Sequence, residues 1–505
     1  MKTYTTRAVA LVASAALLAL TACSAGSSTS GGSSSGSGAD QALSLGLVAE
    51  PASLDFTTTD GAAIPQALLG NVYETLVKQD DSGKIVPSLA KSWTVSPDRK
   101  VYTFDLVDNA KFTNDKPFTA ADAVFSINRV KTGWTTSLKA AMDVVQDAKA
   151  LSPTQLQVTL AKPSNGWLFR MTTRIGAMFS ETGVAKLATE PVGTGAYKFS
   201  KWNRGDSIVL QRNDAYWGTK PFFQQITLKY FKDPTALNNA LLTGTINVIT
   251  TVQAPEALSQ FTGNSKYQVL EGTTNGEVLL SFNNSKPVFR DIRTRQAIRQ
   301  AIDHKALLDT CFAGRGKLIG SMVPPTDPWY EDLTAVAPYD VAKAKSLLQA
   351  SGAAGATLRL RLPTLPYATS CGQVVKSQLE QAGLKVQIDQ LEFPAAWLST
   401  VFKNVDYDMS IIAHVEPRDL GAVFSPTYYT RYNDPELQKD LAAADAGDEA
   451  VQVDNMKKAA RRLSEQAAGD WLFLLPNLIV ADQNLTGLPQ NAITENFDLS
   501  RLARS

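Results

Sequence analysis

Apolar and polar residues follow one another along the chain in patterns that predict both strands and helices. Residues 43–48 are a first strand candidate, and residues 101–106 have the two-residue period of a half-buried strand. Thr119 and Asp122 have the spacing of a capping box, and an apolar stripe with helical spacing follows them. The first part of the chain is therefore expected to mix strands and helices.

Between residues 284 and 474, predicted strands and helices alternate. Apolar residues occupy every second position at 358–362 and again at 384–388, and a helix is expected from about residue 370 to 383. A strand, a helix and a strand within so short a stretch predict a parallel pair with a right-handed crossover. This region is therefore expected to be an α/β lobe.

Several helix ends in the same region are marked by their residues. Asp291 and Asp340 are expected to cap helices, and the second of these helices should end at Gly352. His304 follows Asp303 at a helix boundary, where we expect a solvated or capping role.

The N-terminus has the pattern of a bacterial export signal. Lys2 and Arg7 precede an apolar run at 8–20, which is too short to span a bilayer. The run ends in Leu-Thr-Ala-Cys at 20–23, which resembles the lipobox of bacterial lipoproteins. This resemblance implies that Cys23 becomes the lipidated first residue of the mature chain.

A Ser/Gly-rich segment follows Cys23 and is typical of a flexible tether. We therefore expect a signal peptide at 1–22 and a lipidated tether at 23–39. The alternative is a plain signal peptide cleaved near the same point. The rest of the chain has no uninterrupted apolar span, so we expect it outside the cytoplasm, lipid-anchored to the outer face of the bacterial cell membrane or periplasmic.

Composition narrows the possible functions. The 505 residues predict two to four lobes, and 49 basic against 48 acidic residues give no charge excess that would favour nucleic acid. Three Cys and two His argue against multi-ligand zinc and iron–sulfur sites. No Walker A motif or nucleophile–base pattern is present, so we expect no enzyme activity, no cofactor and no bound metal.

Lipidation of Cys23 would leave an even pair of cysteines in an oxidising compartment. Cys311 is expected near a helix end and Cys371 near a helix start. A disulfide between them is possible, and the alternative is two buried thiols that pack as small apolar side chains.

A series of short motifs extends from residue 51 over much of the remaining chain. They are PASLD at 51–55, NVYETLV at 71–77, PSLA and SW at 87–93, YTF at 102–104, FTAADAV at 118–124, PVGTGAY at 191–197, RNDAYW at 212–217, FN at 282–283, and DIRTRQA followed by AID at 291–303. In this order they resemble the family 5 solute-binding proteins of ABC importers, which bind peptides and include nickel-binding members. Each motif is weak alone, but the ordered series is specific.

The resemblance implies an α/β, two-lobed periplasmic-binding-protein type II fold with an extra subdomain on lobe I, three domains in all. The chain would cross between the lobes near residues 283 and 475, at a hinge. The implied divisions are lobe I at 40–86, 192–283 and 475–505, the extra subdomain at 87–191, and lobe II at 284–474.

Some of the motifs have a structural explanation of their own. Gly193 and Gly195 permit a tight backbone geometry that a side chain would strain. Trp93, Tyr216 and Trp217 are expected in the core or at lobe contacts, because large aromatic residues are usually buried.

The resemblance also implies a function. The protein would be a monomeric lipoprotein that captures di- or oligopeptides between its lobes. It would deliver them to a permease of two transmembrane subunits and their ATPases, with no nucleic acid as partner. A different class of function is a sensor or adhesion lipoprotein with the same fold. A surface hydrolase is disfavoured by the missing catalytic pattern.

In the family, the acid that binds the peptide amine follows a strand with the pattern Tyr-Asp and then a Gly-Trp pair. Here the strand is expected at 406–412, and two acids follow it, Glu416 and Asp419. Their spacing does not choose between them. Arg418 lies in the same segment and is a further ligand-binding candidate; in a structural alternative, both acids pair with Arg418 on a lobe surface.

This sequence departs from the family at one point. Ala413 and His414 stand where the family has Gly-Trp. A histidine there could meet a metal chelate, so the alternative ligand is nickel, another metallophore or a different small solute. One histidine alone is poor evidence for a metal, which normally has several protein ligands.

Overall fold

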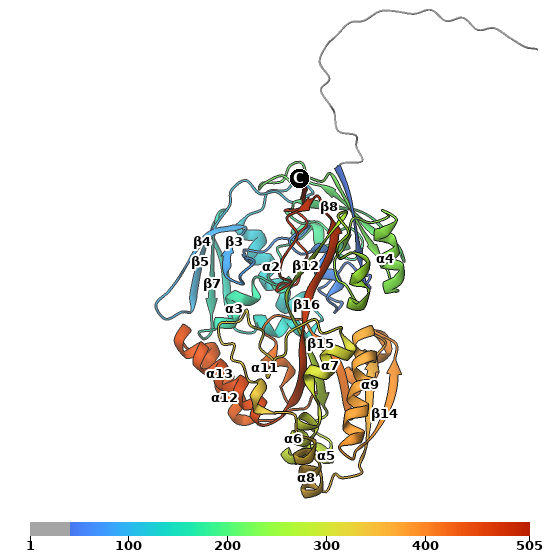
Figure 1. Cartoon of the computed structure of the whole chain (residues 1–505). Coiled ribbons are helices and arrows are strands. Elements are labelled where there is room, and N and C mark those ends of the chain that lie inside the picture. Colours follow the sequence, from blue (N-terminus) through green and yellow to red (C-terminus); the bar gives the residue numbers. More distant parts are fainter. Residues whose placement is uncertain (1–40) are drawn as a thin grey trace, which may run out of the picture. The chain divides into compact units, whose positions relative to one another are not determined.

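The computed structural model describes residues 41–505, and most of their strands lie in one ten-stranded and one four-stranded sheet (Figure 1). The signal segment, Cys23 and the tether lie outside the described residues. Within 41–505, no helix is both long and apolar enough to cross a bilayer.

The ten-stranded sheet is mixed and has the order β14-β13-β15-β12-β16-β11-β1-β10-β9-β8. Strand β1 pairs parallel with β10 and β11, whereas β12 pairs antiparallel with both of its neighbours. Its strands are β1 (Ala42–Leu47), β8 (Tyr197–Asn203), β9 (Ser207–Arg212), β10 (Gln225–Tyr230), β11 (Val248–Ile249), β12 (Tyr267–Phe282), β13 (Thr357–Pro363), β14 (Lys385–Leu391), β15 (Met409–His414) and β16 (Gly469–Asp482).

The four-stranded sheet is antiparallel with the order β4-β5-β7-β6. The remaining strands form two small pairs, β2 with β3 and β17 with β18. These strands are β2 (Val77–Gln79), β3 (Ile85–Pro87), β4 (Ala90–Val95), β5 (Val101–Leu106), β6 (Val145–Ser152), β7 (Gln155–Leu160), β17 (Leu485–Thr486) and β18 (Ala503–Arg504).

Helices connect these strands. The α-helices are α1 (Ala63–Leu68), α2 (Ala120–Gly133), α3 (Asn165–Arg170), α4 (Pro234–Leu242), α5 (Pro287–Arg290), α6 (Ile292–Ala301), α7 (His304–Cys311), α8 (Val341–Ser351), α9 (Pro366–Gln381), α10 (Ala395–Trp397), α11 (Leu420–Val423), α12 (Pro435–Ala446) and α13 (Glu449–Glu465). Short 3₁₀ turns are η2 (Ser137–Met142), η3 (Arg174–Gly176), η4 (Glu181–Lys186), η5 (Pro255–Gln260) and η6 (Thr334–Val336), and η7 (Leu398–Lys403) is a π-helix.

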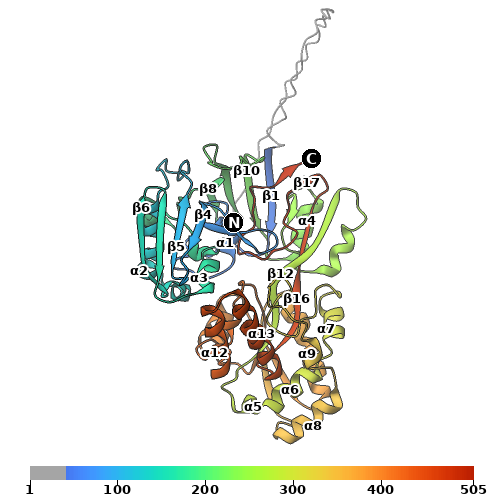
Figure 2. The same cartoon turned by 90° about the vertical axis from the view of Figure 1, so that its left-hand side faces the viewer.

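Strands β12 and β16 are the longest strands of the large sheet and pair with each other. In Figure 2 they run together from the strand group around β1, β8 and β10 to the helices α6, α9 and α13. Their register shifts between Thr273 and Glu277. The largest buried hydrophobic cluster joins residues 43–248 to 479–502, whereas a second cluster joins residues 237–480.

Most of the predicted local elements are present. The capping box of α2 forms, and β13, α9 and β14 make the expected parallel pair. Helix α9 begins at Pro366, four residues before the prediction, because proline suits the first turn of a helix.

The predicted caps also form, with one correction. Asp291 and Asp340 each accept a backbone N–H at the start of a helix, and Gly352 ends α8 with φ 73°. His304, expected to be solvated or capping, instead places Nε2 3.0 Å from the buried carboxylate of Asp470. This partner lies far away in the sequence.

Three of the motifs meet around the buried carboxylate of Glu74. It accepts hydrogen bonds from Thr194 Oγ1 (2.7 Å), Tyr216 Oη (2.8 Å) and Trp217 Nε1 (2.8 Å). A Cβ atom at Gly193 would lie only 1.9 Å from the carbonyl oxygen of Val72. These motifs therefore build one packed junction, which explains the aromatic pair without a ligand.

The two described cysteines are bonded. Cys311 at the end of α7 and Cys371 in α9 form a disulfide across a sequence separation of 60 residues.

Candidate functional site

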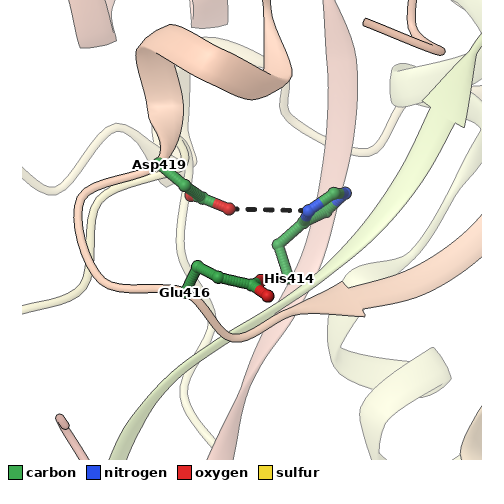
Figure 3. Close-up of side chains that lie close together, drawn as sticks. All are labelled: His414, Glu416 and Asp419. Carbon is green, nitrogen blue, oxygen red and sulfur yellow. Dashed lines mark ion pairs between the residues drawn. The ribbon is translucent and has the colours of Figure 1, made fainter. Parts of the chain in front are cut away.

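The candidate site lies where β15 ends and the loop to α11 begins (Figure 3). Strand β15 runs from Met409 to His414, so it starts later than the predicted 406–412 and extends further. His414 is its last residue and is buried. Its ring stacks on Tyr429, and its Nε2 lies 3.0 Å from the Tyr429 hydroxyl. These contacts fix the orientation of the imidazole.

Asp419 faces His414 across the loop. One of its carboxylate oxygens, Oδ2, lies 3.5 Å from His414 Nδ1, and only 8% of the residue is exposed. Asp419 stands at the N-terminus of α11, but its side chain makes no capping hydrogen bond. Arg418 before it has φ 56°, a left-handed conformation that is costly for a residue with a side chain. The turn thus directs the Asp419 carboxylate to the histidine.

Glu416 lies beside this pair and is partly exposed, although the surrounding protein affects its pKa. About 40% of its side-chain surface is open to water. Nevertheless, burial by the surrounding protein, followed by the charge of Asp419, raises the pKa of its carboxyl.

The nearest cation to Glu416 is already paired. Arg174 Nη2 lies 3.9 Å from Glu416 Oε1 but only 2.7 Å from Glu495 Oε1. Arg174 Nε also donates to Glu495, at 2.8 Å. The charge of Arg174 is therefore mainly balanced by Glu495, and Glu416 keeps much of its own charge uncompensated.

The structural alternative expected both acids to pair with Arg418. In the structure, Arg418 pairs with neither Glu416 nor Asp419. Its Nε donates to Asp327 at 3.3 Å, and its guanidinium carbon lies 4.1 Å from the ring centroid of Phe169 and 4.7 Å from that of Trp329. Phe169 belongs to α3, so this cation connects two separate parts of the chain. The arrangement favours a positioning role for Arg418.

No motif in the sequence marks Glu277, which lies in β12 directly opposite His414. Opposed residues of an antiparallel pair project from the same face of the sheet. Glu277 is 3% exposed, and burial followed by the charge of Asp419 raises the pKa of its carboxyl well above the usual range. The one available signal was an acid placed directly before three apolar residues, 278–280.

A group of polar contacts joins the loops around α3 to the end of α12. Asp445 Oδ1 accepts hydrogen bonds from Ser164 Oγ (2.8 Å) and from the backbone N–H of Gly166 (2.9 Å). Asn165 Nδ2 donates to the carbonyl oxygens of Ala444 (2.8 Å) and Gly447 (2.7 Å). We call these contacts the latch. They join segments that lie about 280 residues apart in the sequence.

The side chains of His414, Glu416 and Asp419 also offer metal ligands. One ligand atom from each lies within 4.8 Å of the others. A nitrogen and two carboxylate oxygens suit a divalent transition metal, although the same acids suit an ammonium group equally well.

Known proteins resemble this chain in sequence and in fold. The family description "Bacterial extracellular solute-binding proteins, family 5 Middle" matches residues 84–435. The nickel-binding periplasmic protein of Escherichia coli K12 is 30% identical over 349 residues, which are 63% of this chain and 65% of that protein. A putative ABC transporter peptide-binding protein of Brucella ovis is 31% identical over 293 residues, 55% of this chain and 54% of that protein. The matched part thus spans about half to two thirds of these relatives.

The solved structures confirm the expected fold class. The periplasmic binding protein DppA of Helicobacter pylori, in complex with the peptide STSA, aligns with a TM-score of 0.82 at 22% identity. The alignment covers 92% of this chain and 98% of that protein. At this identity the likeness concerns the fold alone.

Proposed function

The chain belongs to the family 5 bacterial extracellular solute-binding proteins, and from this premise we propose that it captures di- or oligopeptides by their α-amine for an ABC importer. The observation that carries the proposal is Asp419, a buried carboxylate whose one ion-pair partner among residues 41–505 is His414 at 3.5 Å. A buried carboxylate without a full counter-charge is costly, and a ligand ammonium would supply that charge.

Of the two candidate acids, Asp419 suits the amine better. Glu416 already lies 3.9 Å from Arg174, so part of its charge is compensated. Asp419 has no such cation and is held by the turn at Arg418. We therefore assign the direct contact with the amine to Asp419 and a weaker, supporting charge to Glu416.

Capture would involve closure of two lobes over the peptide. The proposed lobe I comprises residues 40–86, 192–283 and 475–505, and lobe II comprises 284–474. The long strands β12 and β16, which connect the proposed lobes, are candidates for the hinge, and the register shift in β12 supports this. The subdomain at 87–191 would touch lobe II through the latch.

The export and delivery steps complete the proposal. Cys23 would carry the lipid anchor on the outer face of the cell membrane, and residues 24–39 would tether the folded part. The monomer would present its peptide to a permease of two transmembrane subunits and their ATPases.

Calorimetry on purified protein tests the amine contact. The peptides are Ala-Lys-Ala and its N-acetyl form, which differ only in the α-amine. Acetylation should weaken binding at least tens-fold, because breaking a buried charged pair costs about 2–5 kcal/mol. Asp419→Asn should weaken binding of the free peptide by a similar factor and Glu416→Gln by less.

Asp214→Asn is the matched control, because Asp214 is an exposed acid that pairs with Lys220. It should bind the free peptide as the unmodified protein does. Equal affinity for the free and acetylated peptides would refute amine recognition.

A second candidate function is binding of a metal chelate, which the closeness of His414, Glu416 and Asp419 favours. Its probe is Ni²⁺ with L-histidine. If this probe binds, His414→Ala abolishes its binding and neither peptide binds, the metallophore function replaces the peptide function.

A further inference from the structure

Glu277 is a buried acid that no structural contact explains. Its Oε2 is buried and has no hydrogen-bond partner in the part of the chain that the structure describes. A buried carboxylate oxygen without a donor is unfavourable, and structural acids normally acquire donors, as Glu74 does with its three. The position of Glu277 therefore requires another explanation.

The carboxyl belongs to the candidate site by geometry. Glu277 and His414 are register partners on neighbouring strands and project from the same face of the sheet. His414 in turn faces Asp419 at 3.5 Å. Three acids from two different segments, Glu277, Glu416 and Asp419, thus lie close enough to act on one another electrostatically beside His414.

The cations nearby do not balance these acids. Arg174 is engaged by Glu495, and Arg418 is engaged by Asp327. Two further charged residues lie at the edge of this group: the acid Asp60 near Arg174 and the base Arg170 near Arg418. Their charges are opposite, so together they add no net charge. A protonated His414 would bring only one positive charge to this group of three acids.

We propose that Glu277 is a second cation-recognising carboxyl of the site and that the preferred ligand is a peptide with a basic side chain beside its α-amine. The inference rests on the proposed function and names its substrate class. The α-amine would meet Asp419, and a lysine ammonium or arginine guanidinium would supply the donors that Glu277 Oε2 lacks. A peptide with an apolar side chain would leave this oxygen buried and unpaired.

The test compares Ala-Lys-Ala with Ala-norleucine-Ala, whose middle side chain has the same carbon stem without the charge. Calorimetry should give an affinity for the lysine peptide at least about tenfold higher. In Glu277→Gln this preference should fall to near unity. Glu271→Gln is the matched control, because Glu271 lies on the same strand but pairs with Arg315 at the surface, and it should keep the preference.

A thermal melt shows whether Glu277→Gln is folded. Its melting temperature should equal or exceed that of the unmodified protein, because the substitution removes a buried carboxyl that lacks a partner. A lower melting temperature would contradict the description of Glu277 Oε2 as a buried oxygen without a structural donor.

Each other outcome decides something different. Equal affinity of the unmodified protein for the two peptides would overturn the basic-ligand inference and leave amine recognition intact. A lysine preference that survives in Glu277→Gln would overturn the role of Glu277. Failure of both peptides to bind, with or without binding of Ni²⁺ alone, would overturn the peptide function and this inference together.

Discussion

Removing the central acid of the latch should open the protein without unfolding it. Asp445→Ala deletes the acceptor of two hydrogen bonds, from Ser164 Oγ at 2.8 Å and from Gly166 N at 2.9 Å. Both bonds join the proposed extra subdomain to α12 and are absent when these parts separate. The substitution should therefore destabilise the closed state in particular.

The size of the effect follows from the two bonds. A hydrogen bond to a charged group contributes about 1.5–3 kcal/mol, but these are part-buried, so we expect a loss of about 2 kcal/mol for the pair. That corresponds to a factor of roughly 30 in the equilibrium between closed and open forms. If only the closed form holds the peptide, the apparent Kd for Ala-Lys-Ala should rise by up to this factor.

Small-angle scattering and calorimetry together measure this effect. The radius of gyration of the empty Asp445→Ala protein should increase, and its peptide affinity should fall. Asp440→Ala is the control, because Asp440 lies on the same helix and makes no side-chain hydrogen bond to a described residue. Unchanged scattering and affinity in Asp445→Ala would refute the latch, and a large drop in melting temperature would show that Asp445 acts through folding instead.

Three further predictions concern anchoring and stability. Cys23→Ser should move the protein from the membrane pellet to the soluble fraction, and a variant that stays in the pellet would contradict lipidation at this residue. Replacing both Cys311 and Cys371 by Ala should lower the free energy of unfolding in urea by up to about 4 kcal/mol, since the bond closes a loop of 60 residues; an unchanged value would contradict the bond. Asp470→Asn should cost about 3–5 kcal/mol because it leaves the buried guanidinium of Arg299 without its acid. Burial alone would raise the pKa of Asp470, but His304 and Arg299 outweigh it and lower that pKa. The unmodified protein should therefore exceed Asp470→Asn in free energy of unfolding by the full amount above the unfolded pKa of about 3.9, and this difference should shrink as the pH falls through the folded pKa. A difference in urea stability that does not change with pH would contradict this.

Local signals in the sequence predicted much of the fold. Helix-capping residues such as Asp291 and Asp340 bind backbone N–H groups no more than three residues further along the chain. The alternation of apolar and polar residues at 358–362 depends only on which face of the strand is buried. The sequence could also indicate the loop that holds Glu416 and Asp419, since it lies directly after a recognisable strand.

Long-range partners could not be predicted in the same way. His304 was expected near solvent because its partner Asp470 lies 166 residues away. Glu277 was missed because its importance depends on the pairing of β12 with β15, which places it opposite His414. Nothing in the sequence showed that Arg418 pairs with Asp327 instead of its neighbouring acids.

Native mass spectrometry of the protein, purified from its own host without added ligand, tests the central claim most directly. The account predicts a complex whose extra mass corresponds to a short peptide with a free α-amine and a basic residue, and it predicts loss of that complex in Asp419→Asn. A bound molecule that has no amine, or a nickel chelate that persists in Asp419→Asn, would contradict it.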